Sequence, residues 1–549
     1  MDFLGLGHKF AALKPLAPVY KTERVPARPK LPSRTPSSTL RNGAPPSRVA
    51  DAGGGMAVSS PATGTGKKRK EREISGGRAP RKAQSSKTRN SSSQRPLESD
   101  SDSDEEIAAP TKKVKSENTA LDLKRSLKDQ NAFLTEADDI HDSGCEMIHA
   151  ADVMITKRRA KRGDKAGDRK KEEGDVVFLR YPSVSRKERY QLISGGEIID
   201  PIPEELINPY EEIYDIAEIV KDEYMTEEQA VPFGDEHSGI LRQVYRAKNF
   251  ISKTLREERT KKSKDKAKIK ELKDRLLEFK DAVGVYNEAL GTLTKNGSLA
   301  KNLDNKHALS SRLHGMVLKQ VYDRAISPQV ELVTKYKNGT DYVFGELHFP
   351  FISRILTEDT GMKADQVFVD LGSGVGNVVI QAALQIGCES WGCEIMPNCC
   401  KLASIQKTEF FARCRAWGLS TGSVNLEEGN FLENAKIHQA MKRADVILVN
   451  NEVFNPALNQ SLVDLFLDLK EGCKIVSLKS FVPEGHVIND YNQHNPRNLL
   501  QVEKKEFASG DVSWMTGGGN YYVATKDSSI IANYHKSSEE RKTRAARAR

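Results

Sequence analysis

The order of apolar and polar positions predicts two kinds of structure along the chain. Between residues 211 and 325, apolar residues recur every three or four positions with Lys, Asp and Glu between them, which is the pattern of helices that pack on one face. From residue 366 onward, short apolar runs alternate with helical stretches. Such alternation is typical of an α/β fold with a mostly parallel sheet covered on both faces.

The predicted elements are as follows. A short strand at 176–179 precedes helical stretches at 211–222, 241–290 and 312–325. Farther along, the predicted strands are 367–370, 390–394, 423–427, 445–450 and 474–480. The predicted helices between these strands are 377–386, 397–417 and 461–469. Two strands at 511–515 and 521–525, joined through three glycines at 517–519, predict a terminal hairpin that would add an antiparallel edge.

Composition divides the chain into four parts. Residues 1–174 are rich in Pro, Ser, Gly and basic residues and include an acidic serine run at 98–106, so they bury too little apolar surface to fold and are expected to be disordered. Residues 175–335 are expected to form a mainly helical subdomain and residues 336–535 the α/β domain. Residues 536–549 are expected to form a basic tail.

Positive charge is concentrated in clusters outside the predicted domains. The chain has 85 Lys and Arg against 76 Asp and Glu, and the basic clusters lie at 67–70, 157–171 and 541–549. Basic arms are typical of nuclear import signals and of segments that neutralise DNA phosphates. We therefore expect a nuclear protein that contacts DNA through these arms. Solvated, flexible charge is the alternative for any single cluster.

Two further classes are excluded by composition. The sequence has no run of about 18 apolar residues, so no membrane span is expected. The seven cysteines do not repeat at the spacing of zinc ligands. We expect reduced thiols and no metal site.

The strongest chemical signal is a glycine-rich loop that follows a predicted buried strand and opens a helix. It reads Asp370-Leu371-Gly372-Ser373-Gly374-Val375-Gly376-Asn377. Glycines allow a tight turn and a close approach of the backbone to a ligand. The spacing D-x-G-x-G-x-G is not the dinucleotide pattern and resembles the first motif of Rossmann-like S-adenosylmethionine methyltransferases. On its own the loop is weak support, because any tight strand-to-helix turn favours glycine.

Residues after the next two predicted strands fit a nucleoside. Glu394 ends the second strand, where a carboxylate can accept hydrogen bonds from ribose hydroxyls. Asn430 and Phe431 follow the third strand. The amide could bond the exocyclic amine of adenine, and the phenyl ring could stack on the base. Together with the glycine loop, these residues predict a cofactor site.

A third group of candidates flanks the expected position of the sulfonium. The apolar strand at 446–449 ends in Asn450 and Asn451, and Phe454 follows. Ligands of open α/β sheets bind beyond the carboxyl ends of the strands, which would place both amides beside the cofactor. Two amides that only cap a loop are the alternative. Upstream, Glu346 is a candidate partner for the cofactor's amino group or, alternatively, an acid that stabilises a helix N-terminus.

Taken together, the motifs resemble the Dot family, the disruptor-of-telomeric-silencing histone-lysine methyltransferases, in a fungal-like form. The match covers residues 211–534 and includes F-G-E, D-L-G-S-G-V-G-N, G-C-E, G-N-F-L, V-N-N-x-x-F-x-P, L-K-E-G-x-x-I-V-S-x-K-x-F and S-W-x(6)-Y-Y. The resemblance implies a Rossmann-like class I methyltransferase with a seven-stranded sheet and an S-adenosylmethionine-binding domain at 336–535. It implies lysine 79 of nucleosomal histone H3 as substrate, with links to chromatin silencing and the DNA-damage checkpoint.

The resemblance also implies roles for residues and partners. Cofactor contacts are expected from Phe344, Gly345, Glu346 and Leu347, from the loop Asp370 to Asn377, and from Glu394, Asn430, Phe431 and Asn450. The lysine channel is expected to be shaped by Asn450, Phe454, Trp514 and Tyr521. Other histone tails and a ubiquitinated histone are possible further partners, and a monomer is expected.

Two departures from the family pattern affect these expectations. The family commonly has Tyr-Gly-Glu where this chain has Phe344-Gly345-Glu346, which puts any role of that hydroxyl in doubt. The family often has Asp before Phe431, where this chain has Asn430. Because an amide oxygen still accepts a hydrogen bond, the adenine contact should weaken only slightly.

The motif set contains no obvious general base. An ordinary lysine has a pKa near 10.4 and is protonated at neutral pH, so burial in an aromatic channel and the nearby sulfonium are expected to lower it. Amino-methylases of nucleic acids usually carry (N/D)-P-P-(Y/F), which Asn450-Asn451-Glu452-Val453 does not match. A non-catalytic chromatin scaffold is disfavoured by the intact Gly372, Gly374 and Glu394.

Overall fold

The computed structural model describes residues 122–134, 147–154, 176–183, 187–192, 207–257, 266–333 and 345–548. The chain divides into two contact units, and all the described residues belong to the unit formed by 1–17 and 116–549. The expectations for the basic clusters at 67–70 and 157–171 and for the acidic run at 98–106 lie outside the described residues.

A seven-stranded sheet of order β5-β4-β3-β6-β7-β9-β8 lies at the centre of the α/β part. Five strands are parallel: β3 (Val367–Leu371), β4 (Glu389–Glu394), β5 (Val424–Glu428), β6 (Val446–Val449) and β7 (Lys474–Ser477). The last two, β8 (Leu500–Phe507) and β9 (Gly519–Lys526), form an antiparallel hairpin, and β9 also pairs antiparallel with β7. This confirms the predicted Rossmann-like sheet.

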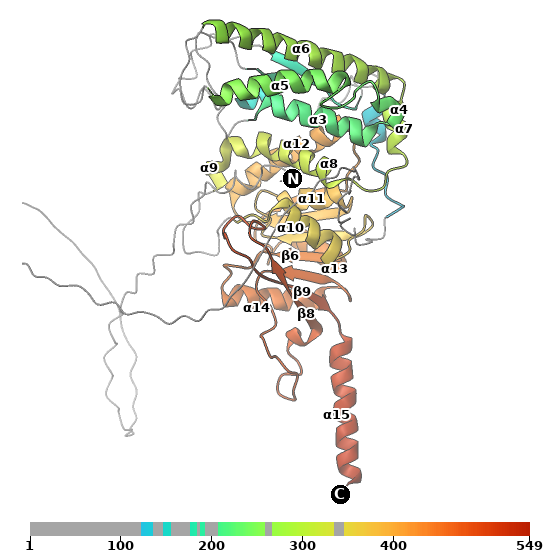
Figure 1. Cartoon of the computed structure of the whole chain (residues 1–549). Coiled ribbons are helices and arrows are strands. Elements are labelled where there is room, and N and C mark those ends of the chain that lie inside the picture. The colour runs from blue at the N-terminus through green and yellow to red at the C-terminus, as the bar shows by residue number, and fades with distance from the viewer. Residues whose placement is uncertain are drawn as a thin grey trace, which may run out of the picture. The chain divides into compact units, whose positions relative to one another are not determined.

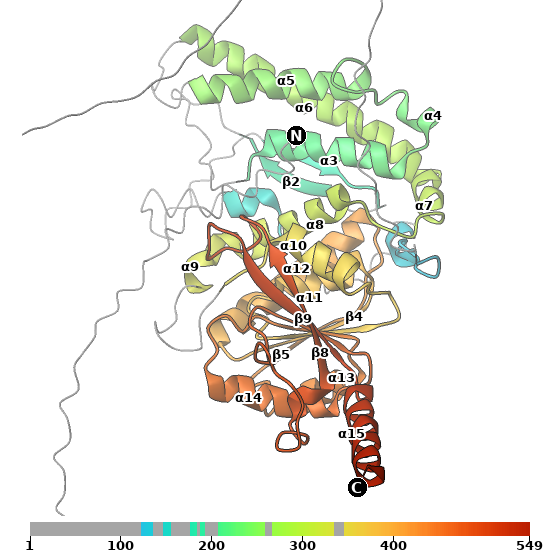
Figure 2. The same ribbon diagram turned by 60° about the horizontal axis from the view of Figure 1, so that its bottom comes forward.

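Alternate residues of the central strands face two different helical layers, as the twofold period of a strand requires. Val367, Val369 and Leu371 pack with α13 (Ala435–Arg443) and α14 (Pro456–Leu465). Phe368 faces the other way, toward α10 (Phe349–Arg354) and the π-helical turn η4 (Ile355–Asp359). Figure 2 shows α13 and α14 on one side of the sheet, and α10, α11 (Asn377–Gln385) and α12 (Pro397–Trp417) on the other.

Helices pack above this second layer (Figure 1). Their bounds are α3 (Pro209–Tyr224), α4 (Glu227–Ala230), α5 (Gly239–Glu257), α6 (Lys266–Lys295), α7 (Ser298–Leu303), α8 (Ser311–Ala325) and α9 (Val330–Val333). A two-stranded antiparallel sheet, β1 (Val176–Arg180) and β2 (Lys187–Gln191), packs with them. One continuous apolar core joins β1, β2, α3, α5, α6, α7 and α8 to α11 and α12. Short 3-10 turns complete the fold: η1 (Gln130–Phe133), η3 (Ser327–Gln329), η5 (Phe466–Asp468) and η6 (Pro496–Leu499).

Capping residues account for the ends of several helices. Asn208 accepts hydrogen bonds from the backbone N–H groups of Tyr210 and Glu211, and Pro209 occupies the first position of α3. Helix α12 likewise begins at Pro397 and ends at Gly418, whose φ of 71° is in the left-handed region. These local signals explain why the boundaries of α12 coincide with the predicted ones.

Two expectations from the sequence are wrong. The first strand of the terminal hairpin is β8, whereas residues 511–515 form a loop that bridges to Leu347 through Val512. Residues 122–134 and 147–154 are not disordered: Leu127 and Met154 are buried, and Phe133 packs against Gly418. The C-terminal segment continues as the helix α15 (Ser529–Arg547). Strand β2 and helix α13 were not predicted.

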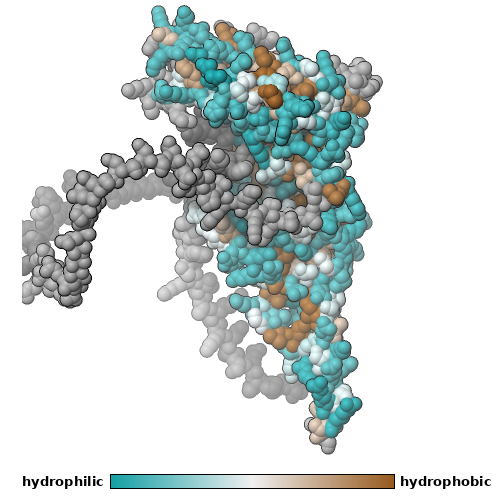
Figure 3. Space-filling view, turned by 45° about the vertical axis from the view of Figure 1, so that its right-hand side comes forward, coloured by the Kyte–Doolittle hydropathy of each residue, from teal (hydrophilic) through white to brown (hydrophobic). Residues whose placement is uncertain are grey.

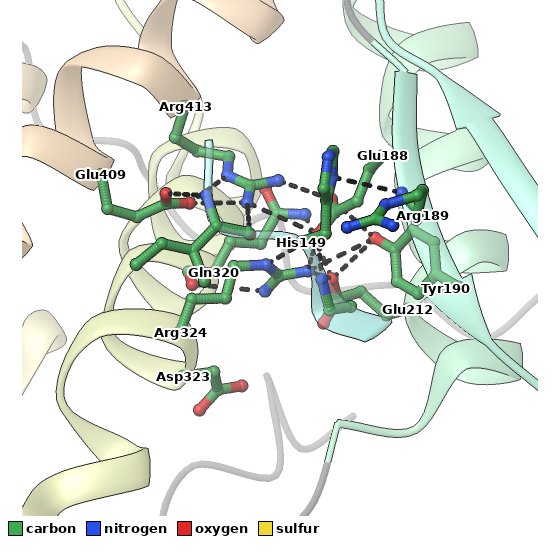
Figure 4. Close-up of polar contacts among 12 residues, drawn as sticks. His149, Glu188, Arg189, Tyr190, Glu212, Gln320, Asp323, Arg324, Glu409 and Arg413 are labelled. Atoms are coloured by element: carbon green, nitrogen blue, oxygen red, sulfur yellow. Dashed lines mark hydrogen bonds and ion pairs between the residues drawn. The ribbon is translucent and has the colours of Figure 1, made fainter. Parts of the chain in front are cut away.

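A buried network of charges joins the helical part to the α/β part (Figure 4). Glu188 of β2 is fully buried and accepts hydrogen bonds from Arg324 of α8 (2.8 Å) and Arg413 of α12 (2.5 Å). Burial opposes ionisation of Glu188, but the two guanidinium groups outweigh it and hold its pKa well below the usual range. The hydroxyl of Tyr181 donates to the same carboxylate at 2.7 Å.

The network extends to both sides of Glu188. Arg324 also pairs with Glu212 of α3, and Arg413 pairs with Glu409 at 2.6 Å. Segment 147–154 contributes backbone donors: the N–H of Ile148 to Glu409 and that of Ala150 to Glu188. The ordering of this segment therefore follows from the need of buried carboxylates for hydrogen-bond donors.

We predict that Arg413→Met destabilises the protein by about 3–5 kcal/mol, because Glu188 and Glu409 would remain buried with fewer donors. The measurement is the midpoint of thermal unfolding. Arg443→Met is the matched control: Arg443 pairs with Glu389 at the surface, where loss of an ion pair costs about 1 kcal/mol or less. Equal shifts for the two variants would show that the network does not carry this stability.

Candidate functional site

A cavity of about 610 Å³ lies at the carboxyl ends of β3, β4 and β6. Its walls come from six segments: 345–347, the loop after β3, the end of β4, the loop after β5, the loop after β6, and Trp514. Open α/β sheets bind ligands beyond these strand ends. The sheet therefore places the predicted motifs around one space.

The glycine loop keeps its backbone close to β4. The N–H groups of Gly372 and Ser373 both donate to the carbonyl of Cys393, at 2.9 and 3.0 Å. Gly372, Gly374 and Gly376 have φ of 89°, 55° and 87°, a region that only glycine adopts at no steric cost. The three glycines are thus needed for the turn itself.

Glu394 is held at the edge of the cavity by two backbone donors. Its Oε2 accepts from the N–H of Gly374 at 2.9 Å and its Oε1 from the N–H of Met396 at 2.7 Å. A carboxylate oxygen can accept more than one hydrogen bond. Glu394 is therefore oriented toward the cavity with remaining capacity for hydroxyl donors.

Asp370 is the penultimate residue of β3, beneath the glycine loop, and lines the same cavity. Burial raises its pKa to about 8, and the nearby Glu394 contributes in the same direction. A carboxyl group in this state gains its charge readily when a cation comes near it.

Glu346 lies on the opposite wall. Its Oε1 accepts from Asn377 Nδ2 at 2.7 Å, and its Oε2 accepts from the hydroxyl of Tyr322 at 3.4 Å. Burial raises the pKa of Glu346 to about 7, although these two hydrogen bonds lower it. The segment is anchored by loop 511–513, since Ser513 Oγ accepts from the N–H of Glu346 and the Ser513 N–H donates to its carbonyl.

Gly345, Asn450 and Trp514 meet on this wall. A Cβ atom on Gly345 would lie 2.7 Å from Cε3 of Trp514, so only glycine lets the indole approach the backbone. Asn450 Nδ2 donates to the carbonyl of Gly345 at 3.2 Å. That bond fixes which end of the amide is the donor and leaves Oδ1 as the acceptor of the side chain.

The chemistry of the lining suits a cation with a flat ring. Among the described residues, four acidic side chains line the cavity, Glu346, Asp370, Glu394 and Glu452, and no described Lys or Arg lines it. The rings of Phe431 and Phe454 lie nearly parallel, with centroids 6.2 Å apart. S-adenosylmethionine carries a sulfonium, an ammonium and an adenine, and these residues fit it. In the part of the chain that the structure describes, no three His, Cys, Asp or Glu residues cluster as metal ligands do.

Comparison with known proteins gives the family. The model for "Histone methylation protein DOT1" matches residues 322–526. A protein of Aspergillus fumigatus named "Histone-lysine N-methyltransferase, H3 lysine-79 specific" is 42% identical over 431 residues, which cover 78% of this chain and 78% of that protein. The chain belongs to the DOT1 family. A protein of the same name from Gibberella zeae is 44% identical over 409 residues, 74% of each chain.

Solved structures of other methyltransferases show weaker similarity. An RNA methyltransferase from Salinibacter ruber in complex with S-adenosyl-L-homocysteine is 24% identical, covers 33% of this chain and 94% of that chain, and has a TM-score of 0.23. An O-methyltransferase from Bacillus cereus is 12% identical, covers 38% and 90%, and has a TM-score of 0.24.

Most residues predicted for a DOT1-family site line the cavity. They are Gly345, Glu346, Leu347, Asp370, Gly372, Ser373, Gly374, Val375, Asn377, Glu394, Asn430, Phe431, Asn450, Phe454 and Trp514. Leu371 and Gly376 do not line it: Leu371 packs in the core below the sheet, and Gly376 turns the chain into α11. Phe344 lies outside the described residues.

Two further predicted residues, Tyr521 and Asn451, are directed away from the cavity. The hydroxyl of Tyr521 donates to Asp359 at 2.7 Å, its ring packs against Phe351, and it does not line the cavity. Asn451 is also directed elsewhere: its amide bonds Asn459 and both backbone groups of Lys479, which ties the loops after β6 and β7 together.

Asn430 lines the cavity but is already engaged in a turn. Its Oδ1 accepts from the N–H of Leu432 at 3.0 Å, and its Nδ2 donates to Glu433. Phe431 is therefore the stronger candidate for the adenine contact.

Sequence analysis did not identify Tyr322, Gln406 and Ser513 as site residues. Each of them forms a direct hydrogen bond with a residue that lines the cavity. Tyr322 and Gln406 lie in helices whose apolar pattern predicts only packing. For Ser513, the sequence offered one signal, its place as the serine of the S-W motif.

We predict that S-adenosylmethionine binds more tightly as the pH rises from about 6 to 9. In the free cavity, Glu346 and Asp370 have pKa values raised to about 7 and about 8, so they are largely protonated at pH 6 and ionise over this range. A cationic ligand favours the ionised carboxylates, so binding should release protons. Titration calorimetry in two buffers of different ionisation enthalpy measures that release.

The matched control for this prediction is Glu346→Gln. That variant should lose the part of the pH dependence centred near 7 and keep the part near 8 that belongs to Asp370. Affinity that does not change with pH, or that falls as the pH rises, would contradict the assignment of these carboxyls to the cofactor.

Proposed function

We propose that this chain transfers methyl groups from S-adenosylmethionine to lysine 79 of histone H3 in nucleosomes. The DOT1-family relatives described above bear this activity in their names, and they align with this chain over most of their length. The observation that carries the proposal is the acidic cavity at the strand ends, which combines the glycine loop with Asn450, Phe454 and Trp514.

Different residues of the cavity would contact different parts of the cofactor. Glu394 would accept from the ribose hydroxyls, Phe431 would stack on adenine, and Glu346 would accept from the amino group. Asp370 would add negative charge beneath the glycine loop. When bound, S-adenosylmethionine supplies a methyl group on a positively charged sulfur as the electrophile.

The remaining residues would desolvate and orient the side-chain amine of the substrate lysine. Phe454 and Trp514 present apolar rings, and an amine buried against them loses hydration, which favours its neutral, nucleophilic form. Asn450 Oδ1 can accept a hydrogen bond from that amine and fix its direction. Alignment of the nucleophile with the methyl group supplies much of the acceleration in such displacements.

Two alternatives keep the same fold. A methyltransferase that acts on another protein or on nucleic acid would use the same cofactor cavity. A non-catalytic chromatin scaffold would not need it. The buried Asp370 and the oriented Glu394 disfavour the scaffold, because maintaining two carboxyls in a vacant cavity costs stability.

We predict that Asn450→Ala lowers kcat on nucleosomes by about 100-fold, the scale of removing one oriented polar group, while cofactor binding remains. The measurement is transfer of labelled methyl to recombinant nucleosomes, with the modified residue mapped by mass spectrometry. Gln460→Ala, which removes a side-chain hydrogen bond to Asp464 on α14, is the control and should match the wild type. Label on another residue, on free histone alone or on nucleic acid would favour the alternative substrates.

The basic C-terminal helix is our candidate for DNA contact. Helix α15 has no buried residue, and hydrophilic side chains predominate along it (Figure 3). Its charged residues from 536 onward are Lys536, Glu539, Glu540, Arg541, Lys542, Arg544 and Arg547.

A nuclear location, a monomeric state, contacts with other histone tails or a ubiquitinated histone, and roles in silencing and the checkpoint are further parts of this proposal. No helix in the described ranges is long and apolar enough to cross a membrane.

We predict that replacing Lys536, Arg541, Arg544 and Arg547 with Gln lowers nucleosome affinity about tenfold at low salt and flattens its salt dependence, because fewer phosphate counterions are released. Binding assays over a salt series measure both effects. The control replaces Lys253, Lys266, Lys268 and Lys273 of α5 and α6 with Gln, which changes the charge equally. If the control loses as much affinity, the effect belongs to net charge and not to α15.

A further inference from the structure

A chain of hydrogen bonds runs from α12 to the carboxylate of Glu346. Gln406 Nε2 donates to Asn377 Oδ1 at 2.8 Å, and Asn377 Nδ2 donates to Glu346 Oε1 at 2.7 Å. From α8, the hydroxyl of Tyr322 donates to the other oxygen of Glu346. Three helices that are separate in sequence thus meet at one carboxylate.

The direction of this chain is fixed by geometry. Gln406 is 2% exposed, and its Nε2 also donates to the carbonyl of Val375 at 3.0 Å. Because that amide nitrogen must face two acceptors, Gln406 presents a donor to Asn377. Asn377 in turn must accept with Oδ1 and present Nδ2 to Glu346. Both contacts to the carboxylate therefore come from donors, and they favour its charged form.

The same carboxylate is one of the four acidic groups that line the cavity. Its backbone is held by Ser513 on the far side. The side chain would otherwise be free to rotate away, since its backbone contacts fix only the start of the side chain. The donors from Tyr322 and Asn377 fix the oxygens themselves.

We propose that Tyr322 and Gln406 are positioning residues: Tyr322 directly, and Gln406 through Asn377, hold the Glu346 carboxylate ready for the cationic amino group of S-adenosylmethionine. This inference rests on the proposed function, because it requires that the cavity bind that cofactor. Neither Tyr322 nor Gln406 lines the cavity, so each acts on the ligand through the cavity residues that it bonds, Glu346 for Tyr322 and Asn377 for Gln406.

The groups around Glu346 set its pKa, so the loss of a hydrogen-bond donor should change how the affinity for the cofactor depends on pH. Among the described residues, the titratable groups that face it are the Tyr322 phenol from α8 and the Cys399 thiol from α12. Burial raises the pKa of Glu346, and the donors from Asn377 and Tyr322 oppose that rise. Removing a donor should therefore raise the pKa further and move the ionisation of Glu346 to higher pH.

The test uses Tyr322→Phe and Gln406→Leu in the full chain. The dissociation constants of S-adenosylmethionine and S-adenosylhomocysteine are measured by calorimetry from pH 6 to 9. For Tyr322→Phe we expect binding about fivefold weaker at pH 7, the scale of one lost hydrogen bond, with the difference shrinking toward pH 9. The controls are Tyr534→Phe and Gln460→Leu. They remove the hydrogen bonds to Asp490 and Asp464, which do not involve Glu346.

The outcomes separate the inference from the proposed function. If the wild type binds neither ligand, the proposed function fails. If the wild type binds and Tyr322→Phe has the same affinity and the same pH profile, the positioning role is overturned. A loss of affinity that is equal at every pH would also overturn it, because a general loosening of the fold would not follow the ionisation of Glu346. Tyr322→Phe decides alone if Gln406→Leu does not fold.

Discussion

Glu188 is the point on which the arrangement of the two parts of the chain depends. Its side chain is fully buried, and the carboxylate is stable as a charged group only because Arg324 and Arg413 lie against it. These arginines come from α8 and α12, so the carboxylate fixes the two helices relative to each other and to β2. An apolar side chain at this position could fill the space but would leave two buried guanidinium groups with fewer partners.

The cavity uses the same two helices. Two residues before Arg324, Tyr322 reaches the carboxylate of Glu346, and two turns before Arg413, Gln406 reaches Asn377. A helix is rigid over such a distance, so helices held by Glu188 also hold these side chains. Trp417 strengthens the link, since its indole nitrogen donates to Gln320 of α8 at 2.9 Å. The helical part is therefore a support for the wall of the site that carries Glu346.

Local sequence signals were sufficient for the parallel strands of the α/β part. The buried strand β3, the glycine loop and the start of α12 at Pro397 each carry a pattern that permits few alternatives, and the structure agrees with them. The hairpin was misplaced because β8 alternates charged residues with few apolar ones, whereas residues 511–515 contain the apolar residues expected of a strand. Those apolar residues instead cover the segment at 345–347.

What the sequence could not predict depends on contacts between distant segments. The packing of residues 147–154 requires the carboxylates of Glu188 and Glu409, which neither segment reveals alone. Tyr521 sits in a motif with Trp514, yet its position on β9 directs its hydroxyl toward Asp359. Likewise Asn450 and Asn451 are adjacent in sequence, but only Asn450 faces the cavity.

Hydrogen exchange tests most directly whether the cavity at the ends of β3, β4 and β6 is the cofactor site. Backbone exchange of the wild-type chain is compared with and without S-adenosylmethionine. If the cofactor binds there, exchange should become slower on binding at residues 345–348, 372–377, 394–396 and 450–454. Unchanged exchange in these four segments, with slowing elsewhere in the chain, would contradict this assignment.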